Sequence, residues 1–480
     1  MRTLAETALA AISFIERMPA RLTDRCRGRG LALMADTCGN VTVVVGFCAI
    51  ALFGGVGIAV DTSIAYNVKS QLAAAVDAAA LAGARAFASP NRDADIRNFF
   101  AANFQEGYMG SVLQPLEIIP NDQNRTITVT ARATIPTFFM SVLGTDSTDV
   151  AATAEATLSS RDVEVALVLD VTGSMNTDGK IDDLIFAANE LVNIVVQDLQ
   201  SPFYSKVALV PYSVGVNVGS YADQVRGSYT AGTTCNYPSA PTCETYGFEN
   251  AGNGNWTELD ISTCVTERTG PQAYTDAAPN IAPVGRNFPK QSHNPCPTAT
   301  IMPLSSNKAA LHAAINSLTA AGSTAGQIGI AWGWYLVSPN FGYLLPADSQ
   351  PKDYGEIHLG QEVMKVVIIM TDGVFNSVYY NGVLAQDSGS GSGSSNYKIN
   401  QNSQNGDPYT QSQSLCTAMK AEGVIVYTVG FDISGSADAT NLMYGCATDA
   451  DHVYLPSTGT ELKQAFRDIA VQVSNLRISM

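Results

Sequence analysis

Basic residues are scarce in this chain of 480 residues. Lys and Arg together number 27 against 43 Asp and Glu, which gives a formal net charge of −16. Proteins that bind nucleic acid need clustered Lys and Arg to neutralise phosphates, so this balance excludes nucleic acid as an expected partner. The acidic excess alone indicates only an acidic, solvated surface. A hydrophobic fraction of 46% with 15% charged residues is typical of a folded chain of two or three domains.

Common catalytic and zinc-binding motifs are also missing. The four histidines show no H-E-x-x-H spacing, and Ser174 is not part of a G-x-S-x-G turn. The cysteines form no C-x-x-C pair, so a zinc site of that kind is not expected. We therefore expect a protein that is not an enzyme, with histidines in surface or structural positions: His293, His312, His358 and His452.

One long apolar run is present. Residues 41–60 are twenty consecutive positions without a charge, about the length of a helix that spans a bilayer. Because orientation follows Lys and Arg, we predict that residues 1–40 are cytoplasmic and that the chain after Asp61 lies outside. A cleaved signal peptide is the alternative, but the apolar core is too long and no clear cleavage site follows it. The arginines that set this orientation are Arg2, Arg17, Arg21, Arg25, Arg27 and Arg29.

The nine cysteines divide at the predicted membrane. Cys26 and Cys38 lie on the reducing side, and Cys48 lies within the span. The other six lie outside, where an even number indicates disulfides. Cys416 and Cys446 are predicted to pair, since both lie in the last third of the chain, away from the others. The pairing of the remaining four stays open: Cys235, Cys243, Cys264 and Cys296.

Helix is expected to continue beyond the apolar run, over residues 41–87, because residues 63–88 are rich in Ala, Leu, Gln and Lys. Residues 89–91 (Ser-Pro-Asn) end it. A pilin-like molecule with a half-embedded helix and an ordinary juxtamembrane stalk both fit this pattern. Residues 92–160 are predicted to form a small pilin-like α+β domain, with a helix at 94–104 and strands at 112–119 (ending at Pro120), 125–135 and 151–158, and a turn at 121–124.

Residues 161–480 alternate strand and helix signals, as in a parallel α/β sheet. Strands are expected at 163–169, 206–212, 365–370, 424–429 and 453–455, and helices at 180–199, 327–337 and 461–476. Two insertions interrupt the pattern. Residues 219–302 hold four cysteines and are predicted to be a disulfide-held subregion at the sheet edge. Residues 386–413 contain a Gly/Ser tract and are predicted to be a flexible surface loop, with a mobile flap over a site as the alternative.

Oxygen-bearing side chains follow the first of these strands. The apolar run at 165–169 ends at Asp170, and Thr172 and Ser174 follow at alternate positions. Ligands of open α/β sheets bind at the carboxyl ends of the strands, and alternate spacing points these three side chains to one side. Such oxygens suit a hard divalent cation such as Mg²⁺.

Two further loops supply the rest of a metal site. Thr324 lies in a Gly-rich turn before a predicted helix, and Asp372 directly follows the buried strand 365–370. The predicted metal ligands are therefore two carboxylates and three hydroxyls, with waters completing the coordination sphere. Mg²⁺ is the expected cofactor, and Mn²⁺ and Ca²⁺ are alternatives. The five residues are Asp170, Thr172, Ser174, Thr324 and Asp372.

These motifs (D-x-T-G-S, a Thr in a G-x-T turn, and T-D-G) resemble the metal-ion-dependent adhesion site of von Willebrand factor A domains. Thr172 stands where that family usually has a Ser, and its hydroxyl can still coordinate. The resemblance implies a Rossmann-like, mostly parallel sheet with helices on both faces. It also implies that the open position of the metal takes a carboxylate from a partner protein, with no bond made or broken.

A second resemblance covers nearly the whole chain from about Gly39. The anchor resembles TadE/TadG-type proteins of the tight-adherence (Flp) pilus system, as do four further features: the run 71–82, the A-W-G-W at 331–334, Cys416 with Cys446, and the ending 476–479. It implies a TadG-like protein of the bacterial inner membrane with periplasmic domains, and surface exposure as an alternative. Processing by the prepilin peptidase is not expected, because Val44 stands where cleaved pilins of that system have Glu.

Two alternatives compete with metal-dependent adhesion. The segment 170–174 also resembles the D-K-T-G-T motif of P-type ATPases, in which Asp170 would be a nucleophile. Against this, Val171 replaces the Lys, Asn376 is out of register for the second metal-loop acid, and the outer compartment lacks nucleotide. The other alternative is a structural envelope protein with a vestigial metal site.

Overall fold

The computed structural model describes residues 40–87, 89, 91–121, 126–157 and 161–477. The predictions for residues 1–39, for most of the turn at 121–124 and for residues 478 and 479 of the ending lie outside this part of the chain. The contacts divide the chain into two compact units, Met1–Thr157 and Leu158–Met480. Each unit is described by itself.

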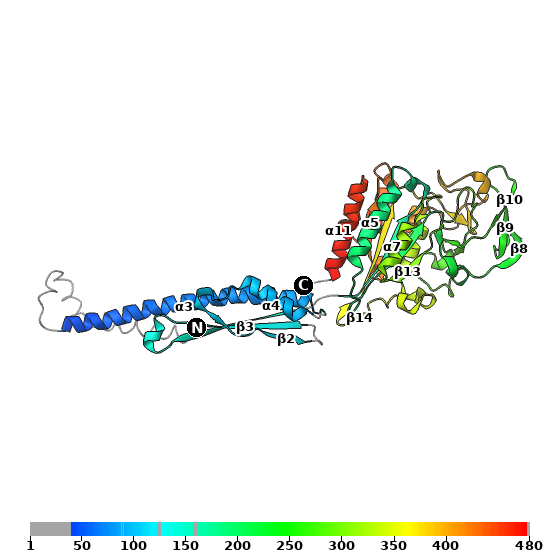
Figure 1. The fold of residues 1–480 in the computed structure, drawn as a ribbon. Helices are drawn as coiled ribbons and strands as arrows, with labels where there is room; N and C mark the ends of the chain where they lie inside the picture. Colours follow the sequence, from blue (N-terminus) through cyan, green and yellow to red (C-terminus); the bar gives the residue numbers. More distant parts are fainter. Residues whose placement is uncertain (1–39, 88, 90, 122–125, 158–160, 478–480) are drawn as a thin grey trace. The chain divides into compact units, whose positions relative to one another are not determined.

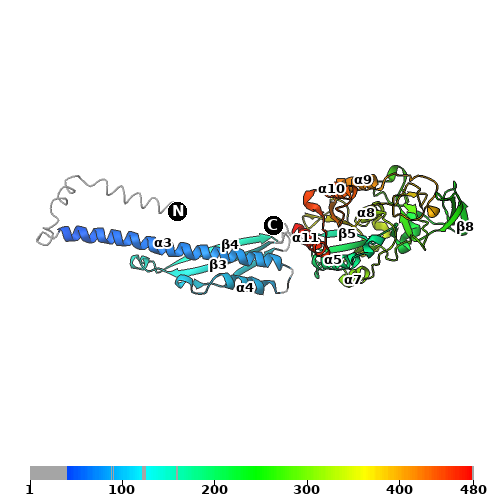
Figure 2. The same cartoon turned by 90° about the horizontal axis from the view of Figure 1, so that it is seen from above.

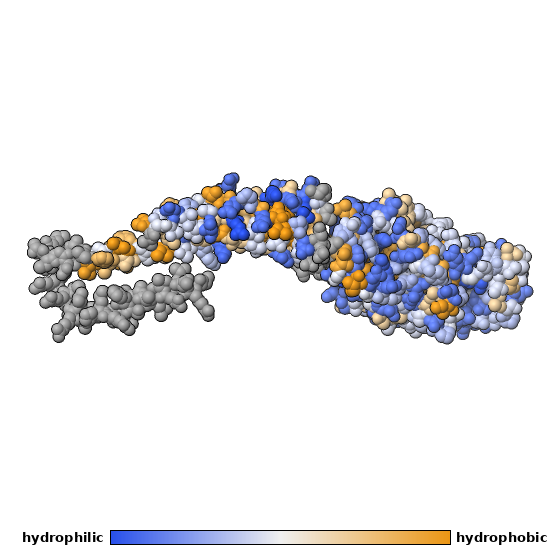
Figure 3. Space-filling model, turned by 90° about the horizontal axis from the view of Figure 1, so that it is seen from below, coloured by the Kyte–Doolittle hydropathy of each residue, from blue (hydrophilic) through white to orange (hydrophobic). Residues whose placement is uncertain are grey.

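The first unit is built on one long helix, α3 (Asn40–Arg85), as predicted (Figure 1). By length and composition it is the one helix among the described residues that could cross a membrane. Its first half exposes large apolar side chains, which Figure 3 shows in orange. Its second half buries a helical stripe against β3 (Thr126–Pro136), β4 (Ser147–Thr157) and α4 (Arg92–Asn103). The buried stripe comprises Val68, Leu72, Ala75, Val76 and Ala79.

The sheet of this unit is antiparallel, and β3 pairs with β1 (Val112–Leu113), β2 (Glu117–Asn121) and β4. The single strand predicted at 112–119 was wrong. Pro115, which has no N–H to donate, lies between β1 and β2, and Pro120 lies within β2 instead of ending it. Pro120 is tolerated because β2 is an edge strand that pairs only with β3.

The second unit contains a sheet whose five central strands are parallel, in the order β6-β5-β16-β19-β20. They are β5 (Val163–Asp170), β6 (Ser205–Tyr212), β16 (Met364–Thr371), β19 (Ile425–Gly430) and β20 (Val453–Tyr454). All five predicted strands are present. Beyond β6 the sheet continues antiparallel through β7 (Val216–Asn217), β11 (Cys264–Thr266) and β12 (Gly285–Arg286), and β13 (Met302–Ser305) also pairs with β6.

Helices cover both faces of this sheet (Figure 2). On one face lie α5 (Lys180–Val195), α7 (Lys308–Asn316) and α11 (Gly459–Arg477), and on the other lie α8 (Gly326–Tyr335), α9 (Pro408–Ala421) and α10 (Ala437–Cys446). Strand β5 is buried throughout, with Leu167 and Leu169 in one core and Ala166 and Val168 in the other. This is why its sequence is continuously apolar. The helix predicted at 180–199 ends earlier, at Val195.

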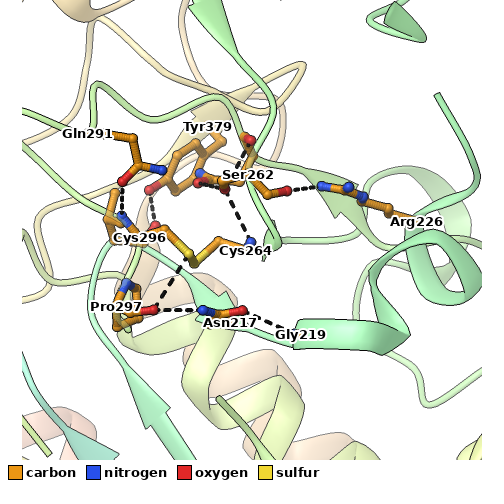
Figure 4. Close-up of a disulfide and its surroundings, with 11 residues drawn as sticks. Asn217, Gly219, Arg226, Ser262, Cys264, Gln291, Cys296, Pro297 and Tyr379 are labelled. Atoms are coloured by element: carbon orange, nitrogen blue, oxygen red, sulfur yellow. Dashed lines mark hydrogen bonds between the residues drawn. A yellow bond between two sulfur atoms is a disulfide. The ribbon is translucent and has the colours of Figure 1, made fainter. Parts of the chain in front are cut away.

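The insertion at 219–302 extends the sheet edge and adds a three-stranded sheet. Its strands are β8 (Thr230–Asn236), β9 (Cys243–Glu249) and β10 (Trp256–Asp260). Disulfides join Cys235 to Cys243 and Cys264 to Cys296, which answers the open pairing. Figure 4 shows the second bridge beside the Asn217 side chain, which donates to the Pro297 carbonyl over 2.8 Å. The predicted Cys416–Cys446 bridge is present between α9 and α10.

Most of the Gly/Ser tract is exposed, as predicted for a surface loop, but the insertion is also tied to the domain by buried contacts, and its flexibility stays a prediction. Ser388, Ser392 and Lys398 are buried within it. The Lys398 ammonium donates to the Ser388 carbonyl over 3.0 Å, and Gly389 N–H donates to the Asn376 carbonyl over 2.8 Å. Composition missed this because the contacts are made by backbone groups and small hydroxyls. The insertion also ends before 413, since α9 begins at Pro408.

A buried ion pair joins the amino ends of β5 and β16. Lys365 donates to Glu164 over 2.6 Å, and Glu164 also accepts from the Tyr204 hydroxyl over 2.9 Å and the Lys352 amide over 3.0 Å. Both charged side chains are almost fully buried. Burial lowers the pKa of Lys365, and the charge of Glu164 opposes this shift. Removing only one partner leaves the other buried and unpaired.

We therefore expect Lys365→Met to lower the free energy of unfolding by about 3–5 kcal/mol. The double variant Glu164→Gln with Lys365→Met removes both charges and should recover most of that loss. Chemical denaturation of a fragment covering residues 158–480 measures both, because all three tryptophans lie in this unit. Equal destabilisation by the single and double variants would contradict the pairing.

Candidate metal centre

Three loops meet at the carboxyl ends of β5 and β16, which are neighbours in the parallel sheet. From β5 the chain passes through α5 on one face to β6, and from β6 it reaches β16 through α8 on the other face. The chain thus reverses direction across the sheet at β5. Such a switch point is where open α/β sheets form ligand sites, because the adjacent loops diverge there.

Asp170 ends β5 and is fully buried. One carboxylate oxygen accepts from the Thr172 amide over 2.9 Å. The other accepts from the Tyr212 hydroxyl over 3.0 Å and from the Thr371 hydroxyl over 2.8 Å. Burial, with the nearby charge of Asp372, raises the pKa of Asp170 to about 6, against the effect of these hydrogen bonds. The carboxylate is therefore held by strands on both sides of β5.

A chain of hydrogen bonds connects the predicted ligands of the first and third loops. The Thr172 and Ser174 hydroxyls lie 2.9 Å apart, and Ser174 donates to Asp372 over 2.5 Å. Asp372 follows β16, so this chain joins residues far apart in sequence. The structure thus brings Asp170, Thr172, Ser174 and Asp372 into one cluster, whose oxygens gather at a single sheet edge.

Thr324 joins the cluster through its backbone. Its amide donates to the Asn376 side chain over 2.9 Å, and its carbonyl accepts from the Asn376 amide over 2.9 Å. The Gly173 amide donates to the Gly322 carbonyl over 2.8 Å, which ties the first loop to the second. Gly322 has φ +86°, a conformation that favours glycine. Hydrogen bonds therefore connect all three loops, and Thr324 is mostly buried; the contacts that place it here are made by its backbone.

Lys180, at the start of α5, places an ammonium at the cluster. It lies 3.2 Å from Asp372 and 3.4 Å from Asp432, and its side chain is only 13% exposed. Burial alone would lower the pKa of Lys180, but the charges of Asp372 and Asp432 raise it overall. The cluster therefore attracts a cation, and in this structure the chain itself supplies one.

Sequence reasoning missed four residues of this arrangement: Lys180, Tyr212, Thr371 and Asn376. Tyr212 ends the strand next to β5 and is in register with Asp170, so its position was a usable signal. Thr371 belongs to the T-D-G motif. Lys180 and Asn376 carried no signal, because their roles depend on how the loops fold back.

The donor set suits a hard cation more than a soft one. Among the described residues there is no group of three or more His, Cys, Asp or Glu placed to hold a metal. A metal here would use two carboxylates, hydroxyls and waters, which is the chemistry of Mg²⁺. Asp372 is a candidate direct ligand, because one of its oxygens accepts from the Ser174 hydroxyl and the other from the Lys180 ammonium, whose place a metal cation could take.

One segment of the chain matches a known family. The model described as "Putative Flp pilus-assembly TadE/G-like" matches residues 39–86, which coincide with α3. This match supports a pilus-related role for a chain with a candidate membrane-spanning helix. A search of curated proteins gave no match.

Several solved structures are similar in part. The pilus adhesin SpaC from Lactobacillus rhamnosus GG, in its open conformation, is 12% identical, with a TM-score of 0.34, over 76% of this chain and 34% of that one. The chain thus spans about a third of the length of SpaC. The vWF domain of the type V pili tip protein Mfa5 from Porphyromonas gingivalis is 13% identical, with a TM-score of 0.36, over 67% of this chain and 97% of that one. The pilus adhesin RrgA from Streptococcus pneumoniae is 12% identical, with a TM-score of 0.35, over 77% and 49%.

The raised pKa of Asp170 predicts a pH-dependent stability in metal-free protein. The folded-state pKa of about 6 lies above the ordinary value of 3.8, so the folded protein holds this proton more tightly than the unfolded chain. The contribution of Asp170 should therefore reduce the free energy of unfolding as the pH rises from about 4 to about 6, by on the order of 3 kcal/mol. Denaturation of the 158–480 fragment in chelator across this range measures it. Asp170→Asn is the control, and an unchanged pH profile in that variant would refute the assignment.

Proposed function

We propose that the second unit is a von Willebrand factor A domain that binds Mg²⁺ through Asp170, Thr172, Ser174, Thr324 and Asp372. The observation that carries this proposal is the cross-linked cluster of three loops at the sheet's switch point, in which hydroxyls and two carboxylates converge. The metal would supply a positive centre with an open position, and the partner would supply a carboxylate to it. Mn²⁺ and Ca²⁺ are alternatives.

The chain's own residues divide the work. Asp170 accepts hydrogen bonds from Thr172, Tyr212 and Thr371, so it fixes the loops that carry the hydroxyl ligands. Its negative charge would attract the metal from the buried side of the site. Asp372 has an ammonium neighbour that a divalent cation can displace. Val374, half exposed two residues beyond Asp372, gives the rim an apolar contact for a partner.

We further propose that the protein is anchored in the bacterial inner membrane by α3 as a single span, with a cytoplasmic amino terminus and periplasmic domains. Its role would be in Tad/Flp pilus assembly or adhesion, as the family match over residues 39–86 supports. The three disulfides suit an oxidising compartment.

The aspartyl-phosphate alternative is disfavoured by the environment of Asp170. Both of its oxygens already accept hydrogen bonds, and the side chain is fully buried, whereas a nucleophile must reach its substrate. A structural protein with a vestigial metal site is the remaining alternative, and measured metal binding separates it from the proposal.

Two single-charge variants should change Mg²⁺ affinity in opposite directions. Asp372→Asn removes a ligand charge and should weaken binding by roughly 10- to 100-fold or more. Lys180→Met removes the competing ammonium and should strengthen it several-fold, as measured by isothermal titration of the 158–480 fragment with MgCl₂. Equal affinity in native, Asp170→Ala and Asp372→Asn fragments would sink the metal assignment.

Partner binding should depend on the same carboxylate. Crosslinking in intact cells, followed by pulldown of the full chain, should recover a partner with the native protein and lose it with Asp372→Asn or after chelation. Glu362→Gln, a charge change at an exposed residue two positions before the amino end of β16, serves as the matched control. Equal recovery of the partner by native chain and Asp372→Asn would argue against metal-bridged binding.

A further inference from the structure

The tip of the β3–β4 hairpin, residues 137–145, exposes apolar side chains and contains no charged residue of its own. Phe138 is 67% exposed, Phe139 48% and Val142 85%. Residues 133–145 are thirteen consecutive positions without a charged side chain. Exposing adjacent aromatic and aliphatic groups to water is unfavourable, so a tip of this composition indicates a contact surface.

The tip folds back onto α3 at the end of the apolar run. Phe139 packs on Gly57, where a Cβ would come within 2.4 Å of the Phe139 Cβ. The Asp61 carboxylate accepts from the amides of Phe138, Phe139 and Met140 over 3.2, 3.0 and 2.7 Å. Figure 1 shows the tip (cyan) beside the first half of α3. Gly57 lies inside the uncharged run 41–60, about 6 Å along the helix axis before Asp61, so the tip overlaps the last turn of the run.

The backbone of the tip is largely satisfied internally. Besides the three amides bound by Asp61, the Thr137 amide donates to Asp146, Val142 to Phe139, and Thr145 to Met140. Asp61 is itself mostly buried by these contacts. Non-helical backbone tolerates the edge of a bilayer only when its polar groups are paired in this way. The tip therefore meets the main physical requirement for contact with lipid.

We propose that this hairpin tip is a second membrane contact, in which Phe138, Phe139 and Val142 enter the headgroup–acyl boundary of the bilayer that α3 crosses. The inference rests on the single span in the proposed function. The bilayer is the occupant because the tip continues the apolar surface of the span itself, has no charged residue, and presents Phe side chains, which segments lying in the interface bury at the headgroup–acyl boundary. Asp61 acts as a positioning residue that holds the tip at this height.

Photocrosslinking of the full chain in vesicles of phosphatidylethanolamine and phosphatidylglycerol tests the proposal. The photoreactive residue p-benzoylphenylalanine replaces Phe138 or Val142 at the tip. It also replaces Phe53, which is 74% exposed within the span, as the positive control. Ile119, 51% exposed in β2, is the negative control, because it pairs with Thr128, far along β3 from the tip. Mass spectrometry then identifies what each position captures.

Phospholipid adducts at positions 138, 142 and 53, several-fold above position 119, are the expected result. Adducts at 53 but not at 138 and 142 would overturn the inference and leave the span intact. Chain-to-chain adducts at 138 and 142 would overturn it in favour of a second copy as occupant. Absence of lipid adducts at 53 would refute the span, and the inference with it.

Discussion

One buried carboxylate, that of Asp170, holds the carboxyl ends of the central strands of the second unit together through its hydrogen bonds. Asp170 accepts from its own loop through Thr172 and from both neighbouring strands through Tyr212 and Thr371. These donors fix the ends of β5, β6 and β16 against one another. The loops that follow can then exchange the backbone hydrogen bonds between Gly173 and Gly322 and between Thr324 and Asn376. The hydrogen bonds of Asp170 therefore help to hold together three loops that come from distant parts of the chain.

The charged side chains at the two ends of the β5–β16 strand pair are arranged differently. At the amino ends, Glu164 and Lys365 are in register and neutralise each other in the interior. At the carboxyl ends, two like charges, Asp170 and Asp372, lie together, and the mostly buried ammonium of Lys180 lies 3.2 Å from Asp372. Like charges in a buried site repel unless a cation intervenes. The charges at the amino ends are therefore neutralised within the protein, whereas the negative charges at the carboxyl ends favour the binding of a further cation. That asymmetry, within one pair of strands, separates a structural ion pair from a candidate binding site.

Much of this arrangement follows from the sequence. Continuous apolar runs located all five parallel strands, because strands buried on both faces leave no polar positions. Asp170, which ends β5, and Asp372, which directly follows β16, were also readable, since the carboxyl ends of neighbouring parallel strands meet at one edge. Lys180 and Asn376 could not be assigned roles, because the contacts of their side chains depend on how the loops fold back. The buried contacts of the Gly/Ser insertion could not be predicted for a related reason: Ser388 and Ser392 are buried by contacts that composition does not encode.

Helix α3 shows the same dependence on contact partners. In its first half the apolar side chains face outward, and in its second half alanines and other apolar residues face the sheet. Asp61 stands between these halves and would be costly near lipid as a free charge. Three backbone amides of the hairpin tip make it tolerable there. The same contact lets Gly57 receive Phe139. An acidic residue in an apolar helix therefore need not lie in water. It can instead be satisfied by hydrogen bonds from another segment of the chain. Here it couples the helix to a second segment, the β3–β4 hairpin tip, through three backbone hydrogen bonds.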